Sequence, residues 1–309
     1  MALSLNCAYG QSGVGKTTLL GMVMDHFDAK AKLYTCEDYG PLQKYVKSGQ
    51  LEVWQINIRD HPFHHCTQAT DGFWPEDPLD VESELIPPTP EDFEEYPLRF
   101  FEGLSTWSEF MIGNYAIGGL AERAGRGDHT GPGTRPGTDE PSFIDGAVRG
   151  SKDSGTPVGG NSMSHYNLVQ RQMHARVVKS QRFPCHVWWT AHEMKAQKDE
   201  YGRTHPNFGP EIVGSAATPR APRWFGNLFH LSIVQAEKEA TARKAKDKYL
   251  KDEGEHRIFL KEHYDPAIPN IPFKAKIRTA YEDIDKIPPS IPFTEKAVMK
   301  FLDTLFNLD

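Results

Sequence analysis

Short apolar and β-branched runs alternate along the chain with longer segments in which apolar residues return at helical spacing. The runs that predict strands lie at residues 3–9, 31–36, 51–58, 98–102, 185–191 and 228–234. The segments that predict helices lie at residues 18–24, 105–120, 164–180 and 294–306. Strands that alternate with helices in this way are typical of an α/β fold with a mainly parallel sheet flanked by helices.

The last part of the chain follows a different pattern. Residues 256–263 and 273–279 predict two strands joined across a proline-rich connection, so we expect an antiparallel C-terminal extension. Thr294 can cap the final helix, whose apolar residues return on one face. They are Val298, Phe301, Leu302, Leu305 and Phe306. This face packs on the core or on a partner subunit, and the pattern does not choose between the two.

Two segments lack the composition of a buried core. Residues 60–97 are rich in Pro, Asp and Glu, whereas residues 123–162 are rich in glycine with interspersed arginines. We expect both to be surface insertions in a single domain that spans residues 1–309. For the three histidines and Cys66 of the first insertion we favour exposed loop residues over a metal site, because no partner cluster has matching spacing. The second insertion orders on single-stranded nucleic acid or on a neighbouring subunit, or it has no partner.

Composition and charge narrow the classes of protein. The chain has 309 residues, a net charge of −7 and a mean hydropathy of −0.57, so nucleic acid can be contacted only through a local basic patch. No apolar run is long enough to span a membrane. The first predicted strand begins almost at Met1, where a cleaved signal peptide would remove it, and we expect a cytoplasmic protein. The four cysteines form no C-x-x-C pair, and we expect them to be reduced and buried.

A glycine-rich stretch joins the first predicted strand to the first predicted helix. It fits the pattern G-x-x-x-x-G-K-[ST] and consists of Gly10, Gln11, Ser12, Gly13, Val14, Gly15, Lys16 and Thr17, followed by Thr18. We call residues 10–17 the phosphate loop. Its glycines permit positive φ and a close backbone approach, so that successive N–H groups point at a polyphosphate. Lys16 can reach the β- and γ-phosphates, and Thr17 can bind Mg²⁺. We therefore expect ATP and Mg²⁺ as cofactors, although the motif itself does not distinguish ATP from GTP.

Polar residues follow three of the predicted strands. Glu37 comes directly after the strand at 31–36, where it either polarises an attacking water or is a solvated loop acid. Glu102 ends the strand at 98–102 and is expected to hold Mg²⁺ directly or through water, or to orient water. His192 follows the strand at 185–191 and either senses the γ-phosphate or is structural.

The order of these pieces resembles the RecA-like ATPases. More closely, it is similar to the short phage-encoded group of nucleotide-binding or single-strand-annealing recombination ATPases. The matching stretches are Gly10 to Thr18, Leu33 to Glu37, Phe100 to Ser105 and His186 to Glu193, with weaker matches at Glu211 to Gly214 and at Lys276-x-Arg278. The N-terminal element that links subunits of a RecA filament and the separate C-terminal domain of RecA have no evident counterpart, so a RecA-type filament is not implied.

The resemblance implies a RecA-like core and roles for several residues. Glu37 would activate water, and Thr190 and His192 would couple the γ-phosphate to DNA-binding loops. Lys276 and Arg278 would reach into the nucleotide site of a neighbouring subunit. The chain would therefore act as a homo-oligomer.

The sequence thus predicts an ATPase that binds ATP and hydrolyses it with Mg²⁺ in phage DNA recombination, annealing or replication. Its partners would be further copies of the chain and single-stranded DNA. The alternative is a nucleotide-dependent switch or assembly ATPase that acts through protein partners without a role on DNA. A small-molecule kinase is disfavoured, because no compact basic acceptor pocket is visible in the sequence.

Overall fold

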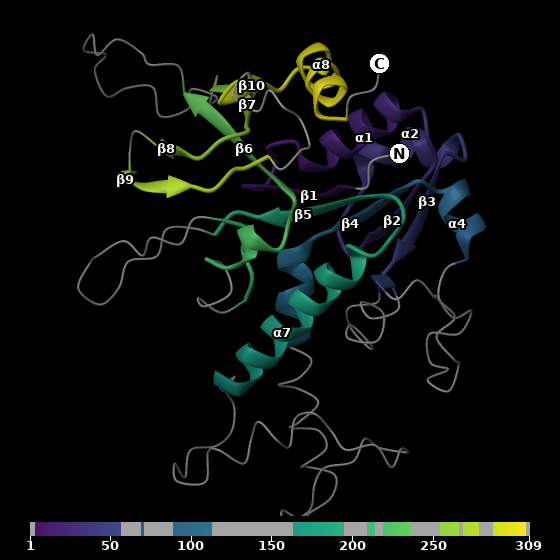
Figure 1. The fold of residues 1–309 in the computed structure, drawn as a ribbon, viewed down its shortest axis with the longest axis horizontal. Coiled ribbons are helices and arrows are strands. Elements are labelled where there is room, and N and C mark those ends of the chain that lie inside the picture. Colours follow the sequence, from purple (N-terminus) through teal and green to yellow (C-terminus); the bar gives the residue numbers. More distant parts are fainter. Residues whose placement is uncertain are drawn as a thin grey trace, which may run out of the picture.

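The structure is a computed structural model (Figure 1). The residues that it describes are 4–56, 69–70, 89–112, 163–194, 209–213, 219–235, 254–265, 268–277 and 287–306. The glycine-rich insertion, most of the acidic insertion with its histidines and Cys66, and Arg278 lie outside these residues. Predictions that concern them stay predictions.

An eight-stranded sheet in the order β10-β7-β6-β1-β5-β4-β2-β3 forms the centre of the molecule. Its strands are β1 (Ser4–Gly10), β2 (Ala31–Thr35), β3 (Leu51–Gln55), β4 (Leu98–Glu102), β5 (His186–His192), β6 (Asn227–Gln235), β7 (Gly254–Phe259) and β10 (Ser290–Pro292). Every pair from β6 to β3 is parallel, whereas β7 and β10 are antiparallel. A separate two-stranded ribbon pairs β8 (His263–Asp265) with β9 (Ile268–Phe273).

Helices cover both faces of the sheet, as Figure 1 shows. They are α1 (Lys16–Phe27), α2 (Gln43–Lys47), α4 (Pro90–Glu95), α7 (Met163–Ser180), α8 (Glu295–Phe306), a helical stretch at 104–112 and the 3₁₀ turns η1 (Gly40–Leu42) and η3 (Ala221–Arg223). Because strand side chains alternate between faces, Phe100 packs with α1 and α8, whereas Phe101 packs with α7 and the 104–112 stretch. The predicted fold class is confirmed: a mainly parallel α/β sheet with flanking helices and antiparallel strands at its C-terminal end.

The structure shows where the apolar face of the final helix packs, which the sequence left open between the core and a partner subunit. Ala297 N donates to Thr294 Oγ1 over 3.4 Å, so Thr294 caps α8 as predicted. The apolar face of α8 is buried in the same cluster as α1, and the Phe301 ring meets the Phe229 ring edge-on. This face therefore packs on the core of its own chain.

Two strand predictions near the C-terminus are wrong. The run predicted at 256–263 divides between β7 and β8, and the strand predicted at 273–279 is placed earlier, as β9. In the described residues 274–277, which follow β9, the backbone pairs at an isolated bridge, in which Lys276 and Leu228 exchange N–H···O bonds of 2.8 and 3.0 Å. The alternation of buried and half-buried residues persists there, but pairing depends on which neighbour lies alongside, and periodicity carries no information on that.

Cysteine burial agrees with the prediction in part. Cys7 and Cys185 are buried, Cys36 is half-buried, and all three have free thiols. Cys36 lies one residue beyond the end of β2, where the chain leaves the sheet, and this explains its partial exposure. In the described part of the chain, no helix is both long enough and apolar enough to cross a membrane.

Candidate nucleotide-binding site

The phosphate loop and the predicted acids meet at one edge of the sheet. Strands β1, β5, β4 and β2 are consecutive neighbours and parallel, so their carboxyl ends lie together. Gly10 is the register partner of His192, and Thr35 is the partner of Glu102. Glu37 follows two residues after the end of β2. The fold therefore brings together the four elements that the sequence indicated separately.

The loop between β1 and α1 has the backbone that an anion site needs. Gly13 and Gly15 have φ values of 81° and 101°, in the left-handed region that favours glycine. No atom lies within 4 Å of the place where a Cβ of Gly13 would be, so the loop is open there. A Cβ on Gly15 would collide with the ring of Phe293, which packs on the loop from the segment before α8. Helix α1 begins at Lys16, so its N-terminus faces the loop.

Lys16 is folded back over its own loop. Its Nζ donates to the carbonyl oxygens of Gly10 and Gln11 at 3.0 and 2.8 Å. Burial lowers the pKa of the ammonium, while the carboxylates of Glu37 and Glu102 oppose that shift. The cation is thus held near the loop by two neutral acceptors, which the more strongly attracting oxygens of a phosphate can replace.

Glu102 is a buried carboxyl with two hydroxyl donors. Thr17 Oγ1 donates to its Oε1, and Thr35 Oγ1 donates to its Oε2 over 3.2 Å. Only 1% of Glu102 is exposed, and burial raises its pKa to about 7 despite these hydrogen bonds. Carboxylate and hydroxyl oxygens at the foot of a phosphate loop are the ligands that Mg²⁺ prefers. The pair of Thr17 and Glu102 therefore has the chemistry of a magnesium site.

Glu37 lies in a different environment. Thr106 Oγ1 donates to its Oε1, and His192 Nε2 lies 3.5 Å from the same oxygen. Burial raises the pKa of Glu37, but the contacts with His192 and Thr106 outweigh burial and leave the pKa below its ordinary value. A quarter of the side chain is exposed, at 25%. Glu37 is therefore an ionised, accessible carboxylate at neutral pH, which is the state that a general base requires.

The end of β5 is tied to the segment that follows β4. Thr190 Oγ1 accepts a hydrogen bond from Gly103 N at 3.0 Å, and His192 N donates to Ser105 Oγ at 2.8 Å. The Thr190 hydroxyl is buried by this contact, whereas 34% of the His192 side chain is exposed. Of these two residues, His192 is the one that reaches the open side of the site.

The backbone of Lys276 lies apart from this cluster within its own chain. It lies beside Leu228, three residues before Leu231, and Leu231 is the register partner of Gly10. Lys276 is thus displaced toward the amino end of β6, away from the phosphate loop. Whether it serves a neighbouring subunit, as the resemblance implies, stays a prediction, and so does the role of Arg278.

Sequence reasoning missed the hydroxyl groups that hold the acids. Thr35 binds Glu102, and Thr106 binds Glu37 across two strands of the sheet. A signal was present, because each threonine lies within four residues of a strand end that carries an acid. A buried hydrogen bond was also missed: His230 Nε2 lies 2.9 Å from Glu193 Oε2, and the His230 ring stacks on the ring of Tyr9.

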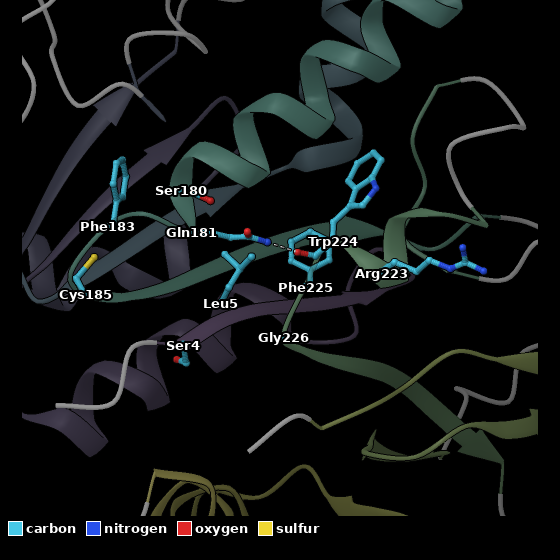
Figure 2. Close-up of a pocket in the computed structure, with 10 residues that line it drawn as sticks. All are labelled: Ser4, Leu5, Ser180, Gln181, Phe183, Cys185, Arg223, Trp224, Phe225 and Gly226. Atoms are coloured by element: carbon cyan, nitrogen blue, oxygen red, sulfur yellow. Dashed lines mark hydrogen bonds between the residues drawn. The ribbon is translucent and has the colours of Figure 1, made fainter. Parts of the chain in front are cut away.

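A cavity of about 250 Å³ opens at the opposite end of the sheet (Figure 2). It lies between the start of β1 at Ser4, the end of α7 at Ser180 and the segment before β6 at Gly226. None of the acids of the phosphate-loop end lines it. Among the described residues, no group of three or more His, Cys, Asp or Glu side chains is placed to hold a metal ion.

Comparison with solved structures finds chains of similar structure. The solved structure entitled "Crystal structure of the RadB recombinase" matches with a TM-score of 0.37 and 8% sequence identity, over 86% of this chain and 84% of that chain. A likeness of this degree carries no argument about what the protein does. No protein-family model matches the sequence, and no curated protein matches it either.

Proposed function

We propose that this protein binds ATP together with Mg²⁺ and hydrolyses the γ-phosphate. One observation carries the proposal: the phosphate loop lies at the same edge of the sheet as a buried carboxyl, Glu102, and an ionised carboxylate, Glu37. The two acids have opposite environments, which suit opposite tasks. A glycine-rich turn with no chemical role would need neither of them.

The residues present fit a nucleotide and a magnesium ion. The backbone at Gly13 is open, Lys16 is held by two carbonyl oxygens, and Thr17 already lies against Glu102. Bound Mg²⁺ would neutralise charge that develops on the phosphates. Thr17 and Glu102 would hold this ion, and Thr35 would orient Glu102 through its Oε2.

The chain's own residues divide the work of hydrolysis. Lys16 and the N–H groups at the start of α1 bind and orient the β- and γ-phosphates. Glu37 accepts the proton of the attacking water, since its carboxylate is ionised and partly exposed. In this account His192, which lies beside Glu37, responds to the γ-phosphate. A further cation from a neighbouring subunit, Lys276 or Arg278, would complete the charge balance.

The proposal extends to DNA through the resemblance of the motifs to phage-encoded RecA-like recombination ATPases. In this account the protein is a homo-oligomer that acts in recombination, annealing or replication, and it binds single strands through its glycine-rich insertion. The rival is a nucleotide-dependent switch or assembly ATPase that works through protein partners. Stimulation of ATP turnover by single-stranded DNA supports the first account, whereas turnover indifferent to DNA supports the second.

Replacement of the phosphate-binding cation tests the nucleotide site. Lys16→Ala is expected to weaken ATP binding by about 10- to 100-fold, because hydrogen bonds between a charged group and the phosphates are lost. Turnover should fall with it, while thermal unfolding stays cooperative. Lys47→Ala, on an exposed position of α2, is the matched control and should bind ATP normally. A folded Lys16→Ala protein with unchanged affinity and rate would refute the assignment.

A further inference from the structure

The segment that follows β4, formed by Gly103 and the start of the helical stretch at 104–112, contacts the ends of both neighbouring strands of the site. Gly103 donates its N–H to Thr190 on β5, and Ser105 Oγ accepts the N–H of His192. The same Ser105 hydroxyl donates to the carbonyl oxygen of Glu211 at 2.7 Å. The position of His192 is therefore set by this segment and by the register of β5.

Thr106, the next residue of the helical stretch, contacts the segment after β2 on the other side. Thr106 Oγ1 donates to Glu37 Oε1, and His192 Nε2 approaches the same oxygen at 3.5 Å. At this distance the histidine contact is at the limit of a hydrogen bond, so Thr106 supplies the directional one. Among the residues that the structure describes, no hydrogen bond or ion pair reaches Glu37 Oε2.

Gly103 makes room for this arrangement. Its φ is 87°, and a Cβ at this position would lie 2.7 Å from Glu37 Oε1. A side chain there would thus strain the backbone and also push the carboxylate out of place. Both residues therefore affect Glu37 Oε1: Gly103 has no side chain that would displace this oxygen, and Thr106 donates a hydrogen bond to it.

We propose that Thr106 is a positioning residue for hydrolysis, which anchors Glu37 through Oε1 so that Oε2 is left to accept the proton of the attacking water. This inference rests on the proposed function, because it needs Glu37 as the base. A glutamate side chain rotates about three bonds, and fixing it before the reaction removes an entropic cost from the chemical step. Thr106 itself touches neither water nor phosphate in this account.

A pair of substitutions separates positioning from structure. Thr106→Val removes the hydroxyl at nearly constant volume and is expected to lower kcat about 10- to 100-fold, with KM for ATP unchanged. Thr106→Ser keeps the donor and should restore most of the rate. Thr304→Val is the matched control, because its hydroxyl donates to the carbonyl oxygen of Lys300 on α8, far from the acids of the site. Gly103→Ala should lower kcat in the same way as Thr106→Val.

The decisive comparison repeats Thr106→Val in a Glu37→Gln background. If Thr106 acts through Glu37, the second substitution has no further effect on the rate. A wild-type kcat for Thr106→Val, an equal loss in Thr106→Ser, or an additive loss in the double variant would overturn the inference. Full turnover by Glu37→Gln would instead overturn the base assignment itself, and absence of ATP hydrolysis by the unaltered chain would overturn both.

Discussion

The two ends of β5 carry histidines in opposite environments. His186, at the start of the strand, is 1% exposed, and its ring packs against Phe27 and Phe306 at 4.7 and 5.0 Å between centroids. His192, at the end of the same strand, is 34% exposed and reaches Glu37. The residue type and the strand are the same, so the difference comes from what surrounds each end.

At the amino end of β5 the side chains of α1 and α8 cover His186, whereas at its carboxyl end His192 lies beside Glu37 in the loop after β2. His186 Nδ1 bonds Ser4 Oγ at 2.9 Å, and its Nε2 finds no hydrogen-bond partner among the described residues. Burial lowers the pKa of His186 to about 4, so the ring stays neutral. The cavity of Figure 2 also lies at this end, apart from the acids. The cavity and the acids of the phosphate-loop end thus lie at different ends of the sheet. The acids, and not the cavity, indicate the candidate site.

The largest expected difference between the ends is in turnover. Glu37→Gln should keep ATP affinity and lose hydrolysis by about 10²- to 10⁴-fold, because the amide cannot accept the proton of water. His186→Phe, at the other end, should leave the rate within about twofold, because uninvolved positions affect turnover little. Steady-state rates and equilibrium ATP binding measure both effects. Full turnover in Glu37→Gln would shift the base role to Asp38, the next acid along the chain.

A smaller effect is expected at the amino end, on stability. The pKa of His186 is about 4 in the folded protein and about 6.5 in the unfolded chain, so between these values the unfolded chain binds the proton more readily. The free energy of unfolding should therefore fall as pH drops from about 6.5 to about 4, by at most about 1.4 kcal/mol per pH unit from this group.

His186→Phe keeps the aromatic contacts and removes the titration. Urea unfolding at several pH values in this window should give a shallower pH slope for His186→Phe than for the unaltered chain. Identical slopes would mean that the proton is taken up elsewhere. His192→Phe is the matched variant at the other end.

Much of the fold and part of the site were predictable from the sequence. Apolar periodicity located the strands of the parallel sheet to within a few residues, and the phosphate loop with its flanking strand and helix identified one edge. The meeting of Glu37, Glu102 and His192 at one edge of the sheet could be predicted because parallel strands present their carboxyl ends together. The order of strands is a tertiary property, so the pairing of Thr106 with Glu37 was not visible.

The wrong strand prediction at 273–279 has the same origin. Lys276 alternates correctly with its buried neighbours Ala275 and Ile277, yet the backbone there pairs with β6 at a single bridge. Alternation reports which face of the chain is buried, and it does not report whether a partner strand runs alongside. The resemblance implies that Lys276 and Arg278 reach into the nucleotide site of a neighbouring subunit, and this role depends on a second chain.

The central claim is that nucleotide binds at the carboxyl end of the sheet and nowhere near the amino end. Imidazole NMR signals of the full chain, assigned with His186→Phe and His192→Phe, test it during titration with a non-hydrolysable ATP analogue and Mg²⁺. The account predicts that the His192 signals shift with saturating dependence on the analogue, whereas those of His186 stay in place. A shift at His186 with none at His192, or no shift at either histidine at saturating analogue, would contradict the account.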